Sequence, residues 1–144
     1  LHRLPRPPAR LAVASVRVEV HGPAAPEEAW ERYLHPERWT TWAPHLTSVA
    51  ASTAVLRRGT TGTVTALGIV PAHFEVLSVD PESRSWSWAV RVGPVELVLH
   101  HSLSAQAGGR AAPGTAAGIT MTGPWPVLTA YRPLMRRALR RLVR

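Results

Sequence analysis

Six short extended runs, separated by turn residues and followed by one amphipathic helical run, limit the folds open to this chain more than any other feature. The runs cover 46–56, 60–68, 72–79, 84–92, 95–104 and 116–122. The segments between them are Arg57-Arg58-Gly59, Pro71, Asp80-Pro81-Glu82-Ser83, Gly93-Pro94 and Gly108-Gly109. Because several are short enough for hairpin connections, they predict an antiparallel meander.

Alternation within the runs predicts a sheet with one buried face. In the run 84–92 the bulky Trp86, Trp88 and Val90 share one face, and serine, alanine and arginine share the other. Residues 12–21 alternate in the same way and predict a first strand. A chain of 144 residues with 45% hydrophobic residues is about one domain. We therefore expect a single domain at 12–144, preceded by a flexible Pro- and Arg-rich tail at 1–11.

Two helical stretches flank the meander. Pro26-Glu27-Glu28 predicts a helix start and His35-Pro36 its end, and a second short helical turn is expected over 36–41. After Gly123, apolar residues recur at the spacing of an amphipathic helix, but Pro133 leaves open whether that helix begins at Val127 or Arg132. The pattern predicts an α+β fold: a curved antiparallel sheet of about seven strands gripping a long C-terminal helix, with one or two short helices between strands 1 and 2.

Composition excludes several classes of site. The chain has no cysteine, which removes disulfide frameworks, zinc ribbons and thiol nucleophiles. Adjacent His100 and His101 face opposite sides of a strand, and no His-Glu-x-x-His or Gly-x-Ser-x-Gly motif occurs. We expect no metal and no cofactor. The apolar run at 11–14 is too short for a signal peptide and the uncharged stretch 111–131 is broken by glycine and proline, so we expect a cytoplasmic protein.

Positive charge is concentrated in the last third of the chain. Residues 1–96 hold ten arginines and nine acidic residues, whereas 97–144 hold seven arginines and no acidic residue. This basic run is either a solvated helix face or a contact with an anionic membrane, an acidic partner or phosphates. No nucleic-acid-binding motif accompanies it, so a nucleic-acid partner is not expected. The arginines that such a membrane contact would use are Arg136, Arg137, Arg140 and Arg141.

Six local sequences carry a resemblance to a known family. In chain order they are Pro26-Glu27-Glu28-Ala29-Trp30, Trp39 with Trp42-Ala43-Pro44, Arg58-Gly59-Thr60-Thr61-Gly62, Asp80-Pro81 with Trp86 and Trp88, His101-Ser102-Leu103, and Gly114-Thr115 with Thr122-Gly123-Pro124. Together they resemble the START-like, or SRPBCC, superfamily over residues 12–143, and most closely its polyketide cyclase/dehydrase-like branch of small bacterial proteins. The sequence departs from that pattern at His35, where relatives often carry an acidic residue. The resemblance implies the helix-grip fold, with a deep apolar cavity between the sheet and the C-terminal helix.

Strand alternation and the helix stripe indicate which residues would line such a cavity. The expected set is Trp42, Phe74, Trp86, Trp88, Leu97, Leu99, His101, Met121, Tyr131 and Met135. Each could equally belong to an ordinary core, since aromatic side chains bury large areas with or without a ligand. His101 and Tyr131 are the candidates for hydrogen bonding or acid–base chemistry. His101 could instead be satisfied by a neighbouring protein group.

Two functions remain open at this stage. The resemblance implies binding of a small hydrophobic or aromatic molecule, lipid-, polyketide- or sterol-like, by a carrier, sensor or accessory protein. The alternative is a cofactor-independent cyclase/dehydratase that acts on a ligand held in the cavity. The fold hosts both activities, and no catalytic constellation stands out in the sequence.

Overall fold

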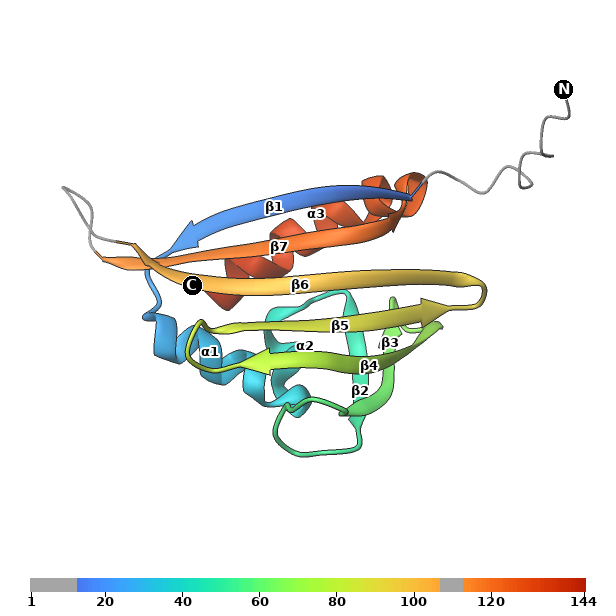
Figure 1. Ribbon diagram of the computed structural model, residues 1–144, viewed down its shortest axis with the longest axis horizontal. Coiled ribbons are helices and arrows are strands. Elements are labelled where there is room, and N and C mark those ends of the chain that lie inside the picture. Colours follow the sequence, from blue (N-terminus) through green and yellow to red (C-terminus); the bar gives the residue numbers. More distant parts are fainter. Residues whose placement is uncertain (1–12, 107–112) are drawn as a thin grey trace, which may run out of the picture.

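A curved antiparallel sheet wraps around one long helix (Figure 1). The computed structural model describes residues 13–106 and 113–144. Its strands are β1 (Val13–Gly22), β2 (Leu46–Ala51), β3 (Thr61–Ala66), β4 (Val70–Asp80), β5 (Ser85–Val92), β6 (Val95–Gln106) and β7 (Gly114–Pro124). They are hydrogen-bonded in the order β1-β7-β6-β5-β4-β3-β2, so the meander from β2 to β7 is closed by β1 at one edge. The predicted helix-grip fold is confirmed.

Short helices fill the connection between β1 and β2, as predicted. They are α1 (Pro26–Leu34), a 3-10 turn (Pro36–Arg38) and α2 (Trp39–Trp42). Proline and two glutamates in the first turn of α1 suit the exposed amide groups there, and Pro36 ends the helix. The buried face of α1 includes Trp30 and Tyr33, which lie over the concave side of the sheet.

The long helix α3 (Trp125–Leu142) begins earlier than either start considered from the sequence. Pro126 stands in its first turn, where the missing N–H costs no hydrogen bond. Pro133 lies inside the helix but on its exposed side, so the carbonyl that it leaves unpaired faces solvent. Within the described ranges no helix is both long enough and apolar enough to cross a membrane.

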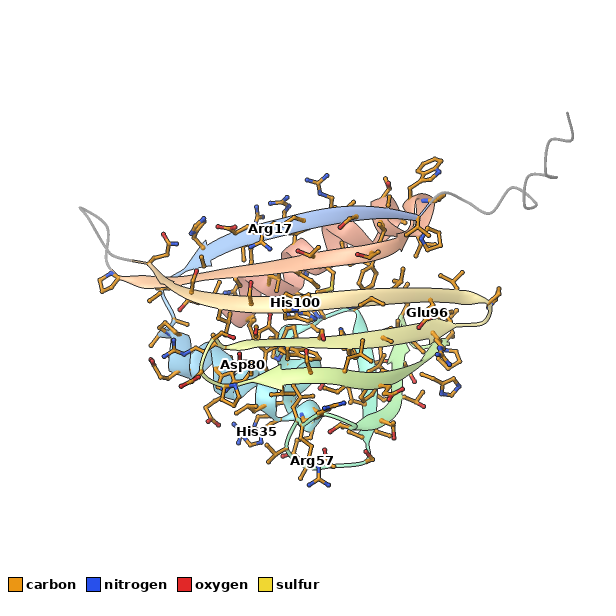
Figure 2. The ribbon with its side chains drawn as sticks, in the orientation of Figure 1. Arg17, His35, Arg57, Asp80, Glu96 and His100 are labelled. Atoms are coloured by element: carbon orange, nitrogen blue, oxygen red, sulfur yellow. The ribbon has the colours of Figure 1, made fainter. Side chains whose placement is uncertain are left out.

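Turn positions agree with the sequence in most places, but β2 ends at Ala51 rather than at residue 56, and one expected turn lies elsewhere. Asp80 Oδ1 accepts the backbone N–H of Glu82 at 3.1 Å in the β4–β5 turn, as an Asp-Pro turn predicts (Figure 2). Pro71, however, does not separate strands. It lies inside β4 opposite Thr65, and the chain reverses at Leu67 and Gly68, whose φ angles are 54° and 76°. Gly68 supplies the left-handed conformation that proline lacks. The predicted tail at 1–11 and the Gly108-Gly109 turn lie outside the described residues.

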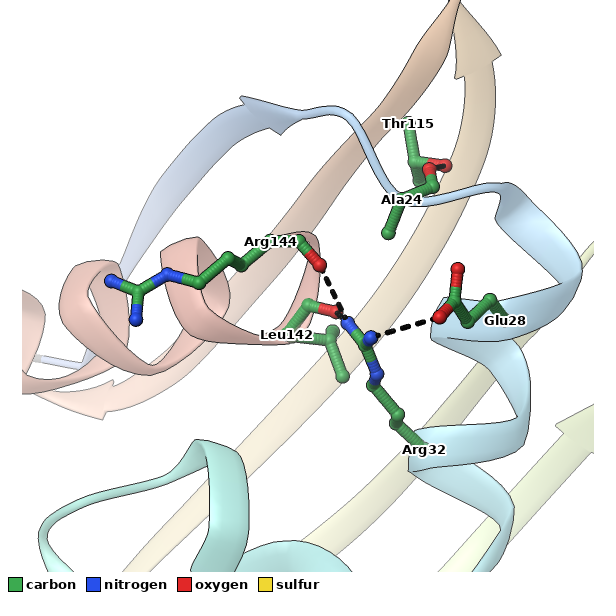
Figure 3. A network of polar contacts seen from close by, with 6 residues as sticks. All are labelled: Ala24, Glu28, Arg32, Thr115, Leu142 and Arg144. Carbon is green, nitrogen blue, oxygen red and sulfur yellow. Dashed lines mark hydrogen bonds and ion pairs between the residues drawn. The ribbon is translucent and has the colours of Figure 1, made fainter.

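A polar network joins the end of α3 to the segment after β1 (Figure 3). The Ala24 N–H donates to the Val143 carbonyl at 2.9 Å. The Arg32 guanidinium of α1 donates to the carbonyls of Leu142 and Arg144, the latter at 3.1 Å, and to Glu28 Oε1 at 3.2 Å. A cation beside the carbonyl end of a helix is favourable, so Arg32 fixes α1 against α3.

Replacing Arg32 with Gln tests this connection. We expect the Arg32→Gln variant to lose about 1–2 kcal/mol of unfolding free energy, because two carbonyls lose a charged donor. Arg38→Gln is the matched control, since its exposed side chain makes no hydrogen bond or ion pair within 13–106 and 113–144. Urea denaturation of the two variants measures the difference, and equal losses would show that Arg32 does not stabilise this junction.

Candidate ligand-binding cavity

A cavity of about 410 Å³ lies between the sheet and the N-terminal half of α3. Its walls come from the start of β2, from β3, β4, β5 and β6, and from one flank of α3. The side chains on these walls are His45, Leu46, Val64, Ala66, Leu67, Val70, Ala72, Trp88, Val90, Val92, Leu97, Leu99, Val127, Ala130, Tyr131 and Leu134. Most are aliphatic, and the exceptions are Trp88, His45 and Tyr131.

The cavity exists because the facing side chains are small at this end of the sheet. Alternate residues of β3 and β4 present Val64, Ala66 and Ala72, and α3 presents Val127 and Ala130 across the gap. None of these side chains is long enough to reach the opposite wall. Folded cores are normally close-packed, so an apolar space of this size, lined at its outer edge by exposed Leu67 and Val92, is a distinct feature of the concave face.

Aromatic rings fill the neighbouring part of the concave face. Trp86 stacks on Trp39 with ring centroids 5.5 Å apart, and Trp88 meets Phe74 edge to face at 5.3 Å. The hollow left among these rings is only about 20 Å³, room for about one water molecule. This part of the core is therefore closed to a ligand of any size.

His101 belongs to this filled region. Its ring stacks on Trp86 with centroids 4.3 Å apart, and its Nδ1 is hydrogen-bonded to the Tyr33 hydroxyl at 3.2 Å. Nε2 of His101 is buried and has no partner among the described residues. Burial, together with the adjacent His100, lowers the pKa of His101 to about 3, so the imidazole is neutral at physiological pH. The Tyr33 hydroxyl thus satisfies one ring nitrogen of His101, which agrees with the expectation that a neighbouring protein group could satisfy this histidine.

His45 and Tyr131 form the polar point of the open cavity. His45 Nε2 and the Tyr131 hydroxyl are 2.9 Å apart, and the two rings meet edge to face. Burial lowers the pKa of His45 to about 4 and raises the pKa of the Tyr131 phenol, so both groups are neutral. Nδ1 of His45 has no partner within the described ranges. Both residues also border the small aromatic hollow, so the pair stands where the open and filled regions meet.

The ten residues expected from the sequence fall into three groups. Four of them border the open cavity: Trp88, Leu97, Leu99 and Tyr131. Four border only the small hollow: Trp42, Trp86, His101 and Met135. The remaining two, Phe74 and Met121, are buried and border neither space. Their role in ligand binding stays a prediction, but the structure places the available volume toward the first group.

Sequence reasoning missed His45 and most of the small residues. His45 is a single histidine between the Trp42-Ala43-Pro44 segment and β2, so no periodicity marks it as inward-facing. Val64, Ala72 and Val90 do alternate toward the core, and a search for small inward residues opposite the α3 stripe would have found them. The large aromatic residues chosen from the sequence lie mostly in the filled region of the concave face. No group of three acidic or histidine residues that could hold a metal ion occurs in the part of the chain that the structure describes.

Comparisons with known proteins agree with this architecture. A family model described as "Polyketide cyclase / dehydrase and lipid transport" matches residues 13–144. A solved structure titled "Crystal structure of Ara h 8.0201" is similar in fold with a TM-score of 0.66 and 14% identity, covering 88% of this chain and 95% of that chain. No curated protein matches the sequence.

The depressed pKa of His101 predicts a pH-dependent stability. The unfolded chain takes up a proton as pH falls through about 6.5, whereas folded His101 stays neutral until about 3, so stability is lost below 6.5. Between pH 7.5 and 5 this histidine should account for about 2 kcal/mol of lost unfolding free energy. Urea titrations at both pH values should show that His101→Phe removes this share, while the exposed neighbour variant His100→Gln keeps it. The same pH difference in all three proteins would contradict the assignment.

Proposed function

The chain belongs to the polyketide cyclase/dehydrase and lipid transport family, and we propose that it binds one compact, mainly apolar molecule in the cavity beneath α3. One observation carries this proposal. The cavity of about 410 Å³ is walled mainly by aliphatic side chains and Trp88, and it holds one hydrogen-bonded polar pair, His45 with Tyr131. Ligand sites of about 300–1,000 Å³ with apolar walls and few polar groups are typical of small-molecule binding.

The volume supports a ligand of limited size. A dry cavity of about 150 Å³ accommodates benzene, so this one has room for roughly two or three rings or an equivalent short chain. The aromatic cluster prevents a longer molecule from extending toward Trp86 and His101. Among lipid-, polyketide- and sterol-like ligands, these dimensions favour a compact aromatic or polyketide-like molecule over a sterol.

The polar pair supports a ligand with one oxygen-bearing group. A tyrosine hydroxyl both donates and accepts hydrogen bonds, so Tyr131 keeps capacity for a ligand carbonyl or hydroxyl while it remains bonded to His45. Contacts with the aliphatic walls supply affinity, and this one hydrogen bond sets orientation. A ligand with several polar groups would leave most of them unpaired, which opposes its binding.

A role as carrier, sensor or accessory protein has more physical support than catalysis. The Tyr131 hydroxyl at the cavity is the observation in favour of the alternative, a cyclase/dehydratase. However, acid–base catalysis is most effective when the pKa of the catalytic group lies near the working pH. Burial moves the pKa of His45 down to about 4 and that of Tyr131 up, away from neutrality in both cases. The pair is suited to orienting a ligand rather than to exchanging protons with it.

Filling the cavity tests the proposal. The probe is N-phenyl-1-naphthylamine, an uncharged aromatic molecule whose fluorescence rises in apolar surroundings. We expect one probe to bind per chain, and Ala72→Phe to weaken its binding at least tenfold, because the added ring occupies the space that the probe needs. His73→Phe is the matched control, since it places the same phenyl ring on the exposed face of the same strand. Titration by fluorescence measures both dissociation constants.

A second variant guards against misfolding of the first. Leu134→Trp fills the same cavity from α3 rather than from the sheet, and it should weaken probe binding in the same direction. Circular dichroism confirms that each variant is folded before titration. If both folded variants bind the probe as well as the parent protein does, the cavity is not the binding site.

A further inference from the structure

The outer face of α3 carries positive charge that no acidic side chain of the described residues pairs with. Arg132, Arg136, Arg137 and Arg140, which we call the basic face, border one shallow surface hollow together with Pro133. Outside α3, four arginines of the described residues pair with glutamates, as in Arg17 with Glu19 and Arg91 with Glu96, whereas Arg38, Arg57 and Arg58 form no such pair. Residues 97–144 contain no acidic residue, and no acidic side chain from 13–96 forms an ion pair with the basic face.

The spacing of these arginines lowers the stability of α3. Arg132, Arg136 and Arg140 follow one another at intervals of four, which places like charges on adjacent turns, where they repel. A helix that keeps this arrangement without acidic partners gains stability when an external polyanion lies against it. Charge complementarity therefore indicates an anionic partner for the basic face.

Exposed apolar side chains gather at the end of the sheet where α3 begins. The strand registers bring the β3–β4 turn, the β5–β6 turn and the β7–α3 junction to that same end (Figure 1). Ile69 is 82% exposed, Leu67 63% and Trp125 53%. Leu67 and the partly exposed Val92 also line the cavity, so the cavity reaches the surface at this apolar end.

We propose that the basic face and this apolar end together form a docking surface for an anionic lipid bilayer, through which the apolar ligand reaches the cavity. The passage of a ligand to the cavity rests on the proposed function, whereas docking to the bilayer does not. A bilayer presents anionic headgroups over an apolar layer, which matches arginines along α3 together with exposed Leu67, Ile69 and Trp125 at the end of the sheet where that helix begins. A nucleic acid would match the arginines but would leave these apolar side chains in water.

Vesicle binding with matched charge removal tests the docking surface. The parent protein should sediment with phosphatidylcholine vesicles that contain phosphatidylglycerol, but not with phosphatidylcholine alone. The double substitution R137Q/R140Q should lower the partition coefficient about 10- to 30-fold, because each removes a cation near the anionic surface. R57Q/R58Q removes the same charge from the exposed loop between β2 and β3, on the opposite side of the molecule from α3, and should change binding less than about threefold (Figure 2).

Trp125→Ala separates insertion of the apolar end from attraction of charge alone. It should weaken binding to the anionic vesicles several-fold while leaving the dependence on salt unchanged. Equal binding to neutral vesicles, or equal loss in the two arginine variants, would overturn the proposal. The proposal would also be overturned if the parent protein bound a DNA duplex but not anionic vesicles, and if R137Q/R140Q abolished the DNA binding.

The two proposals can fail separately. R137Q/R140Q should bind N-phenyl-1-naphthylamine in solution as the parent does, because no substituted residue lines the cavity. Ala72→Phe should lose the probe and keep its binding to anionic vesicles. Loss of vesicle binding with intact probe binding therefore concerns only the docking surface, and the reverse result concerns only the cavity.

Discussion

The packing of aromatic rings between the sheet and the helices is the constraint on which the rest of this structure depends. Trp39, Trp86 and His101 stack in one cluster, and Met135 of α3 borders the same small hollow. Rings of this size hold α3 away from the sheet. Where the facing side chains become valine and alanine, they are too short to fill the gap between the sheet and α3. The cavity therefore begins where the aromatic cluster gives way to smaller side chains.

The same division separates the two histidines that face the interior. His101 lies within the rings and is held by Tyr33, whereas His45 meets Tyr131 at the border of the open space. Burial keeps both neutral near pH 7 by lowering the pKa to about 3 and about 4 respectively. A neutral, hydrogen-bonded polar pair in an aliphatic wall can orient a ligand without the cost of burying a charge. Charge is instead displayed outside, on the face of α3 that points away from the cavity.

Most of the fold, but only part of the site, could be predicted from the sequence. The alternation of apolar and polar residues, together with the turn residues between the runs, predicts the strands and their order. The resemblance to the helix-grip fold predicts how the sheet and the helix are arranged. Pro71 was misread because the reversal depends on Gly68 and a left-handed Leu67, a conformation that leucine rarely adopts. Only some of the cavity residues could be predicted, because alternation shows which face of the sheet a residue lies on but not whether the space next to it is filled. That space depends on the combined volumes of side chains such as Ala72 and Ala130, which are distant in sequence.

The central claim is that the core has one filled end and one open end, and xenon pressurisation of a crystal tests it most directly. Xenon enters apolar cavities that are empty of protein atoms and marks them by its electron density. The account predicts xenon among Val64, Ala72 and Leu99, beneath α3, and none between Trp86 and His101. Xenon at the aromatic cluster, or its absence from the space beneath α3, would contradict the account.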